Sequence, residues 1–251
     1  MIFSKILPEQ TVIMTMRNIH NLDRLIVALD VPSVEVASRI VAKLGDQVRF
    51  YKVGLELFLS GEIFHFLDWL LDRDKKIFVD LKLFDVPATV ARAIKQLNGR
   101  GITFTTVHGN DSMIKAAVEA GSDVNILAVT ALTSLDRGDL VDLGFQCDID
   151  RLVLSRAARA LDYGCAGIVA SGQEAAIVRR EVGEALVIVT PGIRPVENDD
   201  DQKRVVTVQD ALYAGADYVV VGRPIRDSKN PFSAARSLQA EIITALDNVS
   251  Q

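Results

Sequence analysis

Short apolar runs rich in β-branched residues alternate with longer segments of helical periodicity from Leu25 to the end of the chain. Eight of these runs have the length and composition of buried strands. The segments between them carry helix-start signals, such as Ser33 before one amphipathic stretch and Pro231 at the opening of the last. The predicted strands span residues 25–30, 50–57, 76–83, 104–109, 124–133, 167–172, 186–193 and 218–225.

Eight strand–helix units in a chain of 251 residues predict a single α/β domain, the closed parallel (β/α)8 or TIM barrel. A doubly wound sheet of similar length would more often contain fewer strands. We expect the barrel to occupy residues 23–251. Residues 1–22 are expected to be an N-terminal extension or to reflect an uncertain start, since methionines stand at positions 1, 14 and 16. Residues 134–150 are expected to form a short extra helix after the fifth strand.

The third predicted strand carries charges that a buried strand does not need, in the stretch FVDLKLFD (78–85). Because side chains alternate between the faces of a strand, Asp80 and Lys82 share the inward face, and Asp85 follows the strand end on the opposite parity. A salt bridge at a strand end is the structural alternative. The outward residues are expected to be Ile77, Val79, Leu81 and Leu83 here and Tyr51, Val53 and Leu55 in the second strand, where Lys52 and Gly54 face inward.

Polar residues at the carboxyl ends of the strands form one candidate set, because barrel enzymes carry their chemistry there. A salt bridge explains one charged pair, but not the convergence of two aspartates and two lysines from three adjacent strands. Such alternation predicts a network in which a lysine keeps its proton and can deliver it. A structural role is favoured for the lone His108. The set is Asp30, Lys52, Asp80, Lys82, Asp85, His108, Thr130, Thr133, Ser171, Arg194 and Arg223.

The seventh and eighth predicted strands each end in a glycine and an arginine, in the stretches TPGIRP (190–195) and VVVGRPI (219–225). Barrels commonly bind phosphate at these strands, through backbone N–H groups that glycine lets approach and through bidentate arginine contacts. A single stretch with glycine and arginine is also found in ordinary turns, but two of them at the ends of these two strands predict a phosphate site. The acidic stretch 197–201 is interpreted as a solvated loop or, alternatively, as a lid before Gln202.

The composition narrows the classes of partner. A formal net charge of −5 disfavours a nucleic-acid partner, so any anion site must be local. No apolar run reaches the roughly 18 to 20 residues needed to cross a bilayer, and the N-terminal stretch lacks the apolar core of an export signal. Cys147 and Cys165 have no metal or redox spacing. We therefore expect a cytoplasmic protein with free thiols that acts on a small molecule.

Several stretches together resemble one enzyme family. They are FVDLKLFDVPAT (78–89), LIVALD, YKVG, LTS, TPGIRP, DQKR and VGRPI, and they occur in the order found in the orotidine 5′-phosphate decarboxylases. The resemblance covers nearly all of residues 24–240. It implies a carboxy-lyase that converts orotidine 5′-phosphate to uridine 5′-phosphate and carbon dioxide in pyrimidine biosynthesis, with no cofactor and no metal.

The resemblance also implies roles for the charged residues of the third strand. Lys82 would protonate C6 of the pyrimidine ring as carbon dioxide leaves, and Asp80 would lie against the substrate carboxylate. In a homodimer, Asp85 and Thr89 would reach into the site of the neighbouring subunit. One lysine would then supply both the cation and the proton that a carbanion needs.

The resemblance implies further residues that bind the substrate. Asp30 and Lys52 would hold ribose hydroxyls, and Thr133 would contact the base. The residues expected around the 5′-phosphate are Arg194, Gln202, Gly222 and Arg223.

Two other functions would account for part of this pattern: a magnesium-dependent sugar-phosphate lyase and a non-catalytic nucleotide-binding barrel. Magnesium-dependent 3-keto-gulonate-phosphate decarboxylases and hexulose-phosphate synthases share the Asp-x-Lys-x-x-Asp strand but, by resemblance, carry a metal-binding glutamate where this chain has Lys52. A cation at this position opposes a divalent metal. A non-catalytic nucleotide-binding barrel is the other alternative, and binding alone would not need Lys82 with its flanking aspartates.

Overall fold

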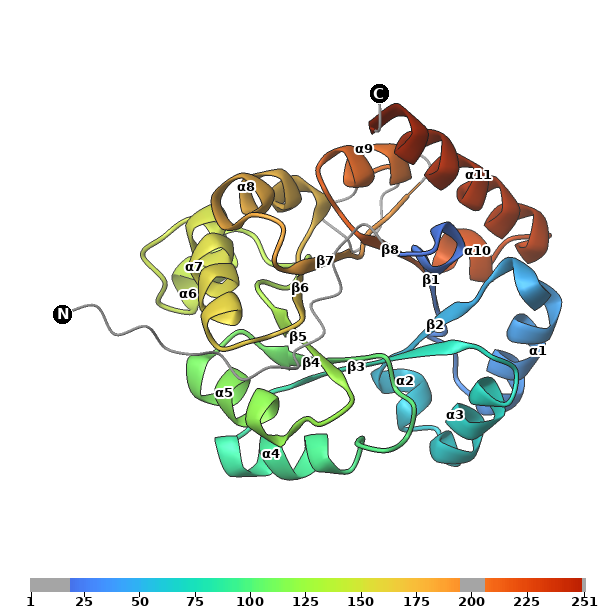
Figure 1. The fold of residues 1–251 in the computed structure, drawn as a ribbon, viewed down its shortest axis with the longest axis horizontal. Helices are drawn as coiled ribbons and strands as arrows, with labels where there is room; N and C mark the ends of the chain where they lie inside the picture. Colours follow the sequence, from blue (N-terminus) through green and yellow to red (C-terminus); the bar gives the residue numbers. More distant parts are fainter. Residues whose placement is uncertain (1–18, 195–205, 250–251) are drawn as a thin grey trace.

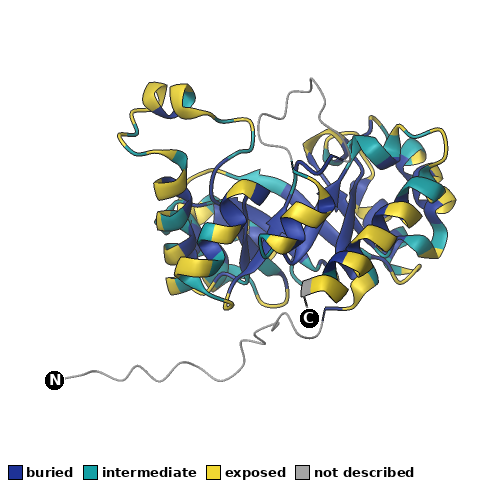
Figure 2. Cartoon of the chain, turned by 90° about the horizontal axis from the view of Figure 1, so that it is seen from above, coloured by how far each residue is buried: buried dark blue, intermediate teal, exposed yellow. Residues whose placement is uncertain are grey.

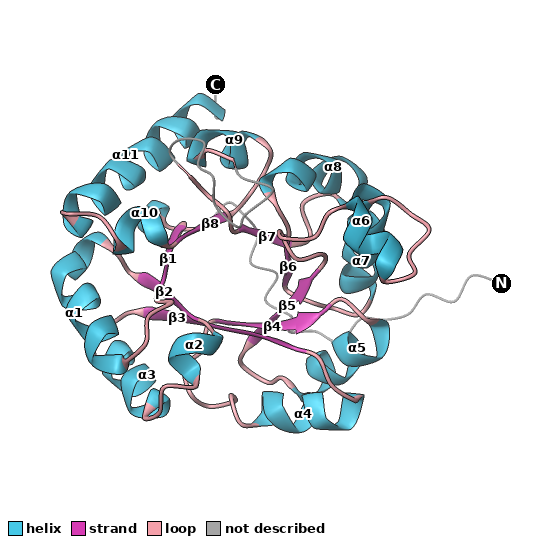
Figure 3. Cartoon of the chain, turned by 180° about the vertical axis from the view of Figure 1, so that it is seen from behind, coloured by secondary structure: helices cyan, strands magenta, loops and turns pink. Residues whose placement is uncertain are grey.

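The computed structural model describes residues 19–194 and 206–249. Eight parallel strands close into a barrel in chain order, and β8 pairs with β1 (Figure 1). Figure 3 shows the strands as a central ring with the helices outside it. The predicted single-domain barrel and its eight strands are confirmed. The strands are β1 (Leu25–Ala28), β2 (Phe50–Val53), β3 (Lys76–Leu83), β4 (Phe104–His108), β5 (Asn125–Val129), β6 (Gly167–Val169), β7 (Val187–Thr190) and β8 (Tyr218–Val221).

At least one helix follows each strand. Ser33 caps the first, with its Oγ accepting from the N–H of Val36 at 3.4 Å, and Pro231 opens the last, as predicted. The helices are α1 (Val34–Leu44), α2 (Leu55–Phe58), α3 (Ile63–Leu71), α4 (Pro87–Lys95), α5 (Asp111–Ala120), α6 (Arg137–Asp142), α7 (Ile149–Asp162), α8 (Gly172–Val182), α9 (Val208–Tyr213), α10 (Arg223–Arg226) and α11 (Pro231–Val249).

The predicted extra helix after the fifth strand is α6. Asp136 and Asp139 form a reciprocal cap at its start: Asp136 Oδ1 accepts from the N–H of Asp139 at 3.1 Å, and Asp139 Oδ2 accepts from the N–H of Asp136 at 2.8 Å. Such a cap satisfies two of the N–H groups that a helix start leaves unpaired. This cap helps the short helix α6 to form outside the barrel.

Alternation along the strands produces two separate apolar layers. Phe50, Phe78, Phe104 and Tyr218 point into the barrel, where neighbouring ring centroids lie 5.3 to 6.0 Å apart. The opposite faces pack against the helices, and they include most of the residues predicted to face outward. Figure 2 shows the buried strands at the centre and the exposed faces of the helices at the periphery. The interior layer closes the barrel beneath its carboxyl end.

Several predicted strands are too long at their carboxyl ends. β2 ends at Val53, and Leu55, which was expected to face the helices, lies on α2 with 57% of its surface exposed. That prediction was wrong because the backbone leaves the sheet at Gly54, which precedes the first residue of α2. The fifth and eighth strands likewise end early, at Val129 and Val221. The residues beyond these ends form the mouth of the barrel.

Charged side chains at the amino end of the barrel serve the fold. Asp217 is fully buried, accepts from the N–H of Ile188 at 2.8 Å and pairs with Arg179. Arg179 also donates to the carbonyl of Gly215 at 2.8 Å, and Arg24 donates to the carbonyl of Asp217 at 3.0 Å. These bonds tie β7 and α8 to the residues that precede β1 and β8, and they give the buried side chains of Arg24 and Asp217 polar partners.

The helices and the cysteines bear on two predictions made from composition. No helix within residues 19–194 and 206–249 is long and apolar enough to span a membrane. Cys147 is partly exposed, Cys165 is buried, and both are free thiols. Residues 1–18 of the predicted extension lie outside the described residues, whereas Ile19 packs against the interior apolar layer.

Candidate active site

A cavity of about 560 Å³ opens at the carboxyl ends of the strands. Its floor is formed by apolar side chains of the interior layer, and its wall carries both signs of charge. Among the described residues, five cationic side chains and two carboxylates line it, so the site is locally positive although the chain as a whole is negative. Such a surface favours an anionic ligand. The charged lining residues are Asp30, Lys52, Asp80, Lys82, Arg194, Arg223 and Arg226.

β3 is irregular where it reaches the cavity. Val79 pairs with Thr105 and Leu83 pairs with Val107, so β3 has two more residues than β4 between these pairs. Within this bulge Lys82 has a φ of 49°, a left-handed conformation that few non-glycine residues adopt. Asp80 and Lys82 both line the cavity, as predicted. It is the bulge, however, and not regular alternation, that places Lys82.

Four charged side chains from β2, β3 and the segment after β1 form a continuous chain. Asp30 Oδ1 lies 2.8 Å from Lys52 Nζ, which lies 3.6 Å from Asp80 Oδ2. The same Asp80 oxygen lies 2.8 Å from Lys82 Nζ. Each lysine therefore has a carboxylate partner, and Asp80 holds two ammonium groups at once. The predicted charge network is confirmed as a set of contacts.

Gly54 leaves room for this network. A Cβ at position 54 would lie 2.7 Å from Asp30 Oδ1 and 3.0 Å from Lys52 Nζ, closer than side chains tolerate. Position 54 therefore faces the ion pair, as its predicted inward orientation requires, and only glycine leaves enough space there. Any larger residue would displace the ion pair between Asp30 and Lys52.

Lys52 and Asp80, at the centre of the network, stay charged although both side chains are buried. Burial opposes the ammonium form of Lys52, but the carboxylates of Asp80 and Asp30 outweigh it and raise the pKa of Lys52 above its ordinary 10.5. Burial likewise opposes the ionised form of Asp80, but Lys52 and Lys82 and a hydrogen bond from Thr106 lower its pKa below the ordinary 3.8. Both groups are therefore ionised around neutral pH.

Thr106, in the middle of β4, is part of the site and was missed from the sequence. It is fully buried, and its hydroxyl donates to Asp80 Oδ1 at 2.9 Å and accepts from the N–H of Lys82 at 2.9 Å. The same hydroxyl thus holds both the bulged backbone and the carboxylate. Its inward position follows from the parity of Phe104, two residues earlier, so alternation could have identified it.

Thr106→Val should lower the free energy of unfolding by about 1–3 kcal/mol, because it leaves a partly buried N–H and a buried carboxylate oxygen without their hydroxyl partner. Valine keeps the shape of the side chain. Urea denaturation measures the change, and Thr244→Val is the matched control, since Thr244 donates to the carbonyl of Ala240 at 3.0 Å on an exposed helix. Equal losses in the two variants would contradict a special role for Thr106.

The cationic wall lies at the ends of β7 and β8. Gly192 has a φ of 81°, which a side chain would strain, and Gly222 precedes α10. Arg194 is only 7% exposed and donates to the carbonyl of Ile193 at 2.9 Å. Arg194, Gly222 and Arg223, predicted around a phosphate, all line the cavity, whereas Gln202 and the stretch 197–201 lie outside the described residues.

Arg226 completes this wall, and sequence reasoning did not identify it. It lies three residues after Arg223 on α10, so both side chains reach the cavity from the same short helix. That spacing is visible in the stretch RPIR and could have indicated the residue.

Besides Asp85, three residues of the candidate set do not line the cavity. Thr130 donates to a backbone carbonyl of β6 at 2.9 Å, and Ser171 caps α8 together with Glu174. His108 packs against Phe84 with ring centroids 5.0 Å apart. Its pKa is lowered by burial and by the nearby cations Arg156 and Lys82. These contacts agree with a structural role for all three.

Asp85 and Thr89 also lie away from the cavity of their own chain. Asp85 is exposed and accepts from the N–H of Val86 at 2.6 Å. Thr89 is partly exposed and accepts from Arg92 at 3.1 Å. Thr133, in contrast, lines the cavity.

Comparison with known proteins points to one family. Residues 23–238 match the model of the "Orotidine 5'-phosphate decarboxylase / HUMPS family". The chain is 61% identical over 222 residues to the orotidine 5′-phosphate decarboxylase of Methylococcus capsulatus, covering 88% of this chain and 92% of that protein. It is 51% identical over 227 residues to the enzyme of Xanthomonas axonopodis pv. citri, covering 89% and 93%. The crystal structure of the Lactobacillus acidophilus orotidine 5′-phosphate decarboxylase matches with a TM-score of 0.77 at 35% identity, over 88% of this chain and 99% of that one.

Proposed function

Because this chain belongs to the orotidine 5′-phosphate decarboxylase / HUMPS family, we propose that it converts orotidine 5′-phosphate to uridine 5′-phosphate and carbon dioxide. The observation that carries the proposal is the Lys82 ammonium, held 2.8 Å from Asp80 at the wall of a cationic cavity. A lysine in this position holds a proton beside developing negative charge. The enzyme is then a cofactor-independent carboxy-lyase of pyrimidine biosynthesis, and its free cysteines suit the cytoplasm.

Lys82 is the proposed proton donor. In the reaction the bond between C6 and the substrate carboxylate breaks, and its electron pair stays on C6 while carbon dioxide leaves. Lys82 Nζ then gives a proton to C6, which completes uridine 5′-phosphate. Before the transfer, the ammonium stabilises the carbanion electrostatically, and the apolar floor of the cavity strengthens this effect by excluding water.

Asp80 is proposed to face the departing carboxylate. Two unit charges ~4 Å apart in an effective dielectric near 20 repel by about 4 kcal/mol, which corresponds to roughly a thousandfold in rate. Enzymes commonly accelerate reactions by more than about a millionfold. Repulsion therefore assists the reaction without accounting for it, and the larger contribution comes from binding energy at the remote phosphate.

The remaining contacts in the proposal follow the wall of the cavity. Asp30 and Lys52, already paired with each other, would bind ribose hydroxyls at one side, and Thr133 would contact the base. The positive end of the cavity suits a phosphate, because arginine and backbone N–H groups bind its oxygens. The proposed phosphate ligands are Arg194, Gln202, Gly222 and Arg223.

We further propose a homodimer in which Asp85 and Thr89 serve the partner's site. Their side chains do not line their own cavity. Next to Asp85 stand two large apolar side chains, Phe84 at 64% and Val86 at 61% exposed. Large exposed apolar side chains are typical of a surface that becomes buried in a subunit interface. A carboxylate among them can extend across such an interface to a site on the partner.

Mixing two inactive variants tests the shared site. Lys82→Ala and Asp85→Ala should each be inactive alone, whereas a heterodimer of the two contains one intact site, with Lys82 and Asp85 from different chains. Random exchange of equal amounts should restore about one quarter of the parent activity, because about half the dimers are mixed and each has one active site. Activity that stays at the level of the separate variants after subunit exchange would exclude the shared site.

Decarboxylation should be unaffected by a chelator. Lys52 Nζ lies 2.8 Å from Asp30 and 3.6 Å from Asp80, so a cation already occupies the position between the two carboxylates that a divalent metal would need. The measurement is release of carbon dioxide from orotidine 5′-phosphate after dialysis against EDTA, with added magnesium as the control. Activity that is lost with EDTA and restored by magnesium would favour the sugar-phosphate lyases. Binding of uridine 5′-phosphate without any turnover would favour the non-catalytic barrel.

A further inference from the structure

Arg226 lies at the junction between the cationic wall and the charge network. It ends α10, and its N–H donates to the carbonyl of Gly222 at 3.0 Å. The N–H of Ile225 donates to the same carbonyl at 3.0 Å. The four-residue helix is thus fixed to the glycine that opens it, so Arg226 and the Gly222 turn move as one unit.

The guanidinium of Arg226 is oriented by two partners. Its Nε and Nη2 donate to Asp227 Oδ1 and Oδ2 at 2.7 and 3.1 Å, a bidentate pair. Its Nη1 donates to the backbone carbonyl of Asp30, 196 residues away in the chain. The planar guanidinium, with several N–H donors, contacts the Asp227 carboxylate and the Asp30 carbonyl at the same time. The ammonium group of a lysine lacks this fixed, forked geometry.

Asp30 depends on this contact because the strand has already ended. β1 stops at Ala28, and the N–H of Leu29 makes the last bond to β2, donating to the carbonyl of Lys52 at 2.9 Å. The side chain of Asp30 is 43% exposed, and its carboxylate pairs with Lys52. Arg226 therefore holds the backbone of the residue that begins the network leading through Lys52 and Asp80 to Lys82.

We propose that Arg226 is a positioning residue that fixes Asp30 and so ties the Gly222 turn to the charge network. The proposal rests on the proposed function, because it assigns Arg226 a part in the same reaction. Arg226 acts through Asp30 and not as a ligand of the phosphate. A displacement of about 1 Å at Asp30 would disturb both the ribose contact and its pair with Lys52, and such shifts cost up to roughly a hundredfold in rate.

A double-mutant cycle tests the route through Asp30. Arg226→Gln should lower kcat/KM for orotidine 5′-phosphate by roughly tenfold to a hundredfold. In an Asp30→Ala background the same substitution should change kcat/KM by less than about twofold, because the group it positions is already gone. The inhibition constant of inorganic phosphate should stay within about twofold of the parent value in Arg226→Gln, since the phosphate ligands are intact.

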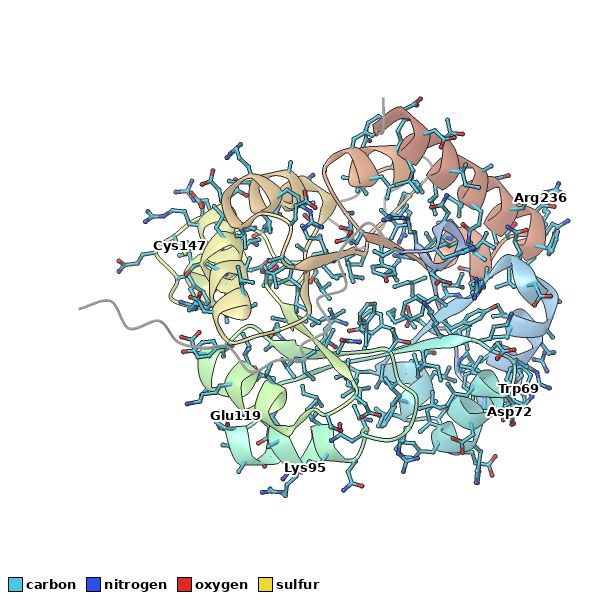
Figure 4. The ribbon with its side chains drawn as sticks, in the orientation of Figure 1. Trp69, Asp72, Lys95, Glu119, Cys147 and Arg236 are labelled. Carbon is cyan, nitrogen blue, oxygen red and sulfur yellow. The ribbon has the colours of Figure 1, made fainter. Side chains whose placement is uncertain are left out.

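The matched control is Arg236→Gln, which removes an exposed arginine at the outer rim of α11 (Figure 4) and should leave kcat/KM unchanged. An Arg226 effect that persists in the Asp30→Ala background, or a weaker inhibition by inorganic phosphate, would overturn the proposal in favour of direct phosphate binding. A lower melting temperature with unchanged kcat/KM would overturn it in favour of a purely structural role. A parent chain that does not turn over orotidine 5′-phosphate would instead refute the proposed function itself.

Discussion

Lys82→Ala is expected to lower kcat for orotidine 5′-phosphate by at least about ten-thousandfold, while the affinity for uridine 5′-phosphate changes by no more than a few fold. The variant removes the group proposed to donate the proton and to stabilise the carbanion, and general acid catalysis and electrostatic stabilisation each contribute about two decades or more. In the proposed function, product binding depends mainly on the cationic wall at the ends of β7 and β8, which the substitution leaves intact. Single-turnover kinetics and calorimetry with uridine 5′-phosphate measure the two quantities.

Two further variants make this result specific. Lys95→Ala removes an exposed lysine of α4, far from the cavity at the edge of the molecule in Figure 4, and should keep the parent rate. Lys82→Gly should match Lys82→Ala in activity and fold at least as well, because glycine accepts the φ of 49° at this position. A Lys82→Ala enzyme that turns over at more than about a hundredth of the parent rate would remove this lysine from the role of proton donor.

Asp80→Asn is expected to reduce both stability and turnover. The amide leaves two ammonium groups facing a neutral side chain, and breaking a buried pair costs about 3–5 kcal/mol. We expect about 3 kcal/mol, because Lys52 keeps Asp30 at 2.8 Å. If repulsion of the substrate carboxylate contributes, kcat should fall by up to roughly a thousandfold and KM should fall as well. If Asp80 only holds Lys82, kcat should fall with KM unchanged.

The difference in the free energy of unfolding between the parent and Asp80→Asn should shrink at acidic pH. The pKa of Asp80 is lower in the folded protein than its ordinary 3.8, so its ion pairs contribute stability above that value and lose it as the pH falls through the lowered pKa. The raised pKa of Lys52 has the opposite sign, and its contribution is lost only as the pH rises above 10.5. Urea denaturation should therefore give a constant difference from about pH 5 to 9 that shrinks below about pH 4. A difference that does not shrink as the pH falls below about 4 would contradict the ionised network.

The barrel could be predicted because its signal is local and repeated. Each strand is a short apolar run, each is followed by a helical segment, and the count of eight selects a closed parallel sheet. The carboxyl ends of the strands were less predictable, since the apolar pattern continues past Val53 into Leu55 although the backbone has already turned. Leu55 is apolar yet 57% exposed on α2, so the apolar pattern does not mark the residue at which the strand ends.

The candidate site was predictable where charge stood out against an apolar strand, as at Asp80 and Lys82. Thr106 was less visible because a threonine is an ordinary strand residue, and its role appears only once β3 and β4 are side by side. The bulge of β3 is a property of the pairing between two strands, which neither strand specifies alone. Arg226 could not be linked to Asp30 from the sequence, since 196 residues separate them.

Lys82 satisfies two requirements that different residues would meet better. Its φ of 49° suits glycine and asparagine, whereas the proposed reaction needs an ammonium group. A single change in the third base of a lysine codon produces asparagine. A duplicated gene that drifted in this way would encode a barrel with less backbone strain and no proton donor, so asparagine or glycine at this position would mark a paralogue that has left catalysis while keeping its fold.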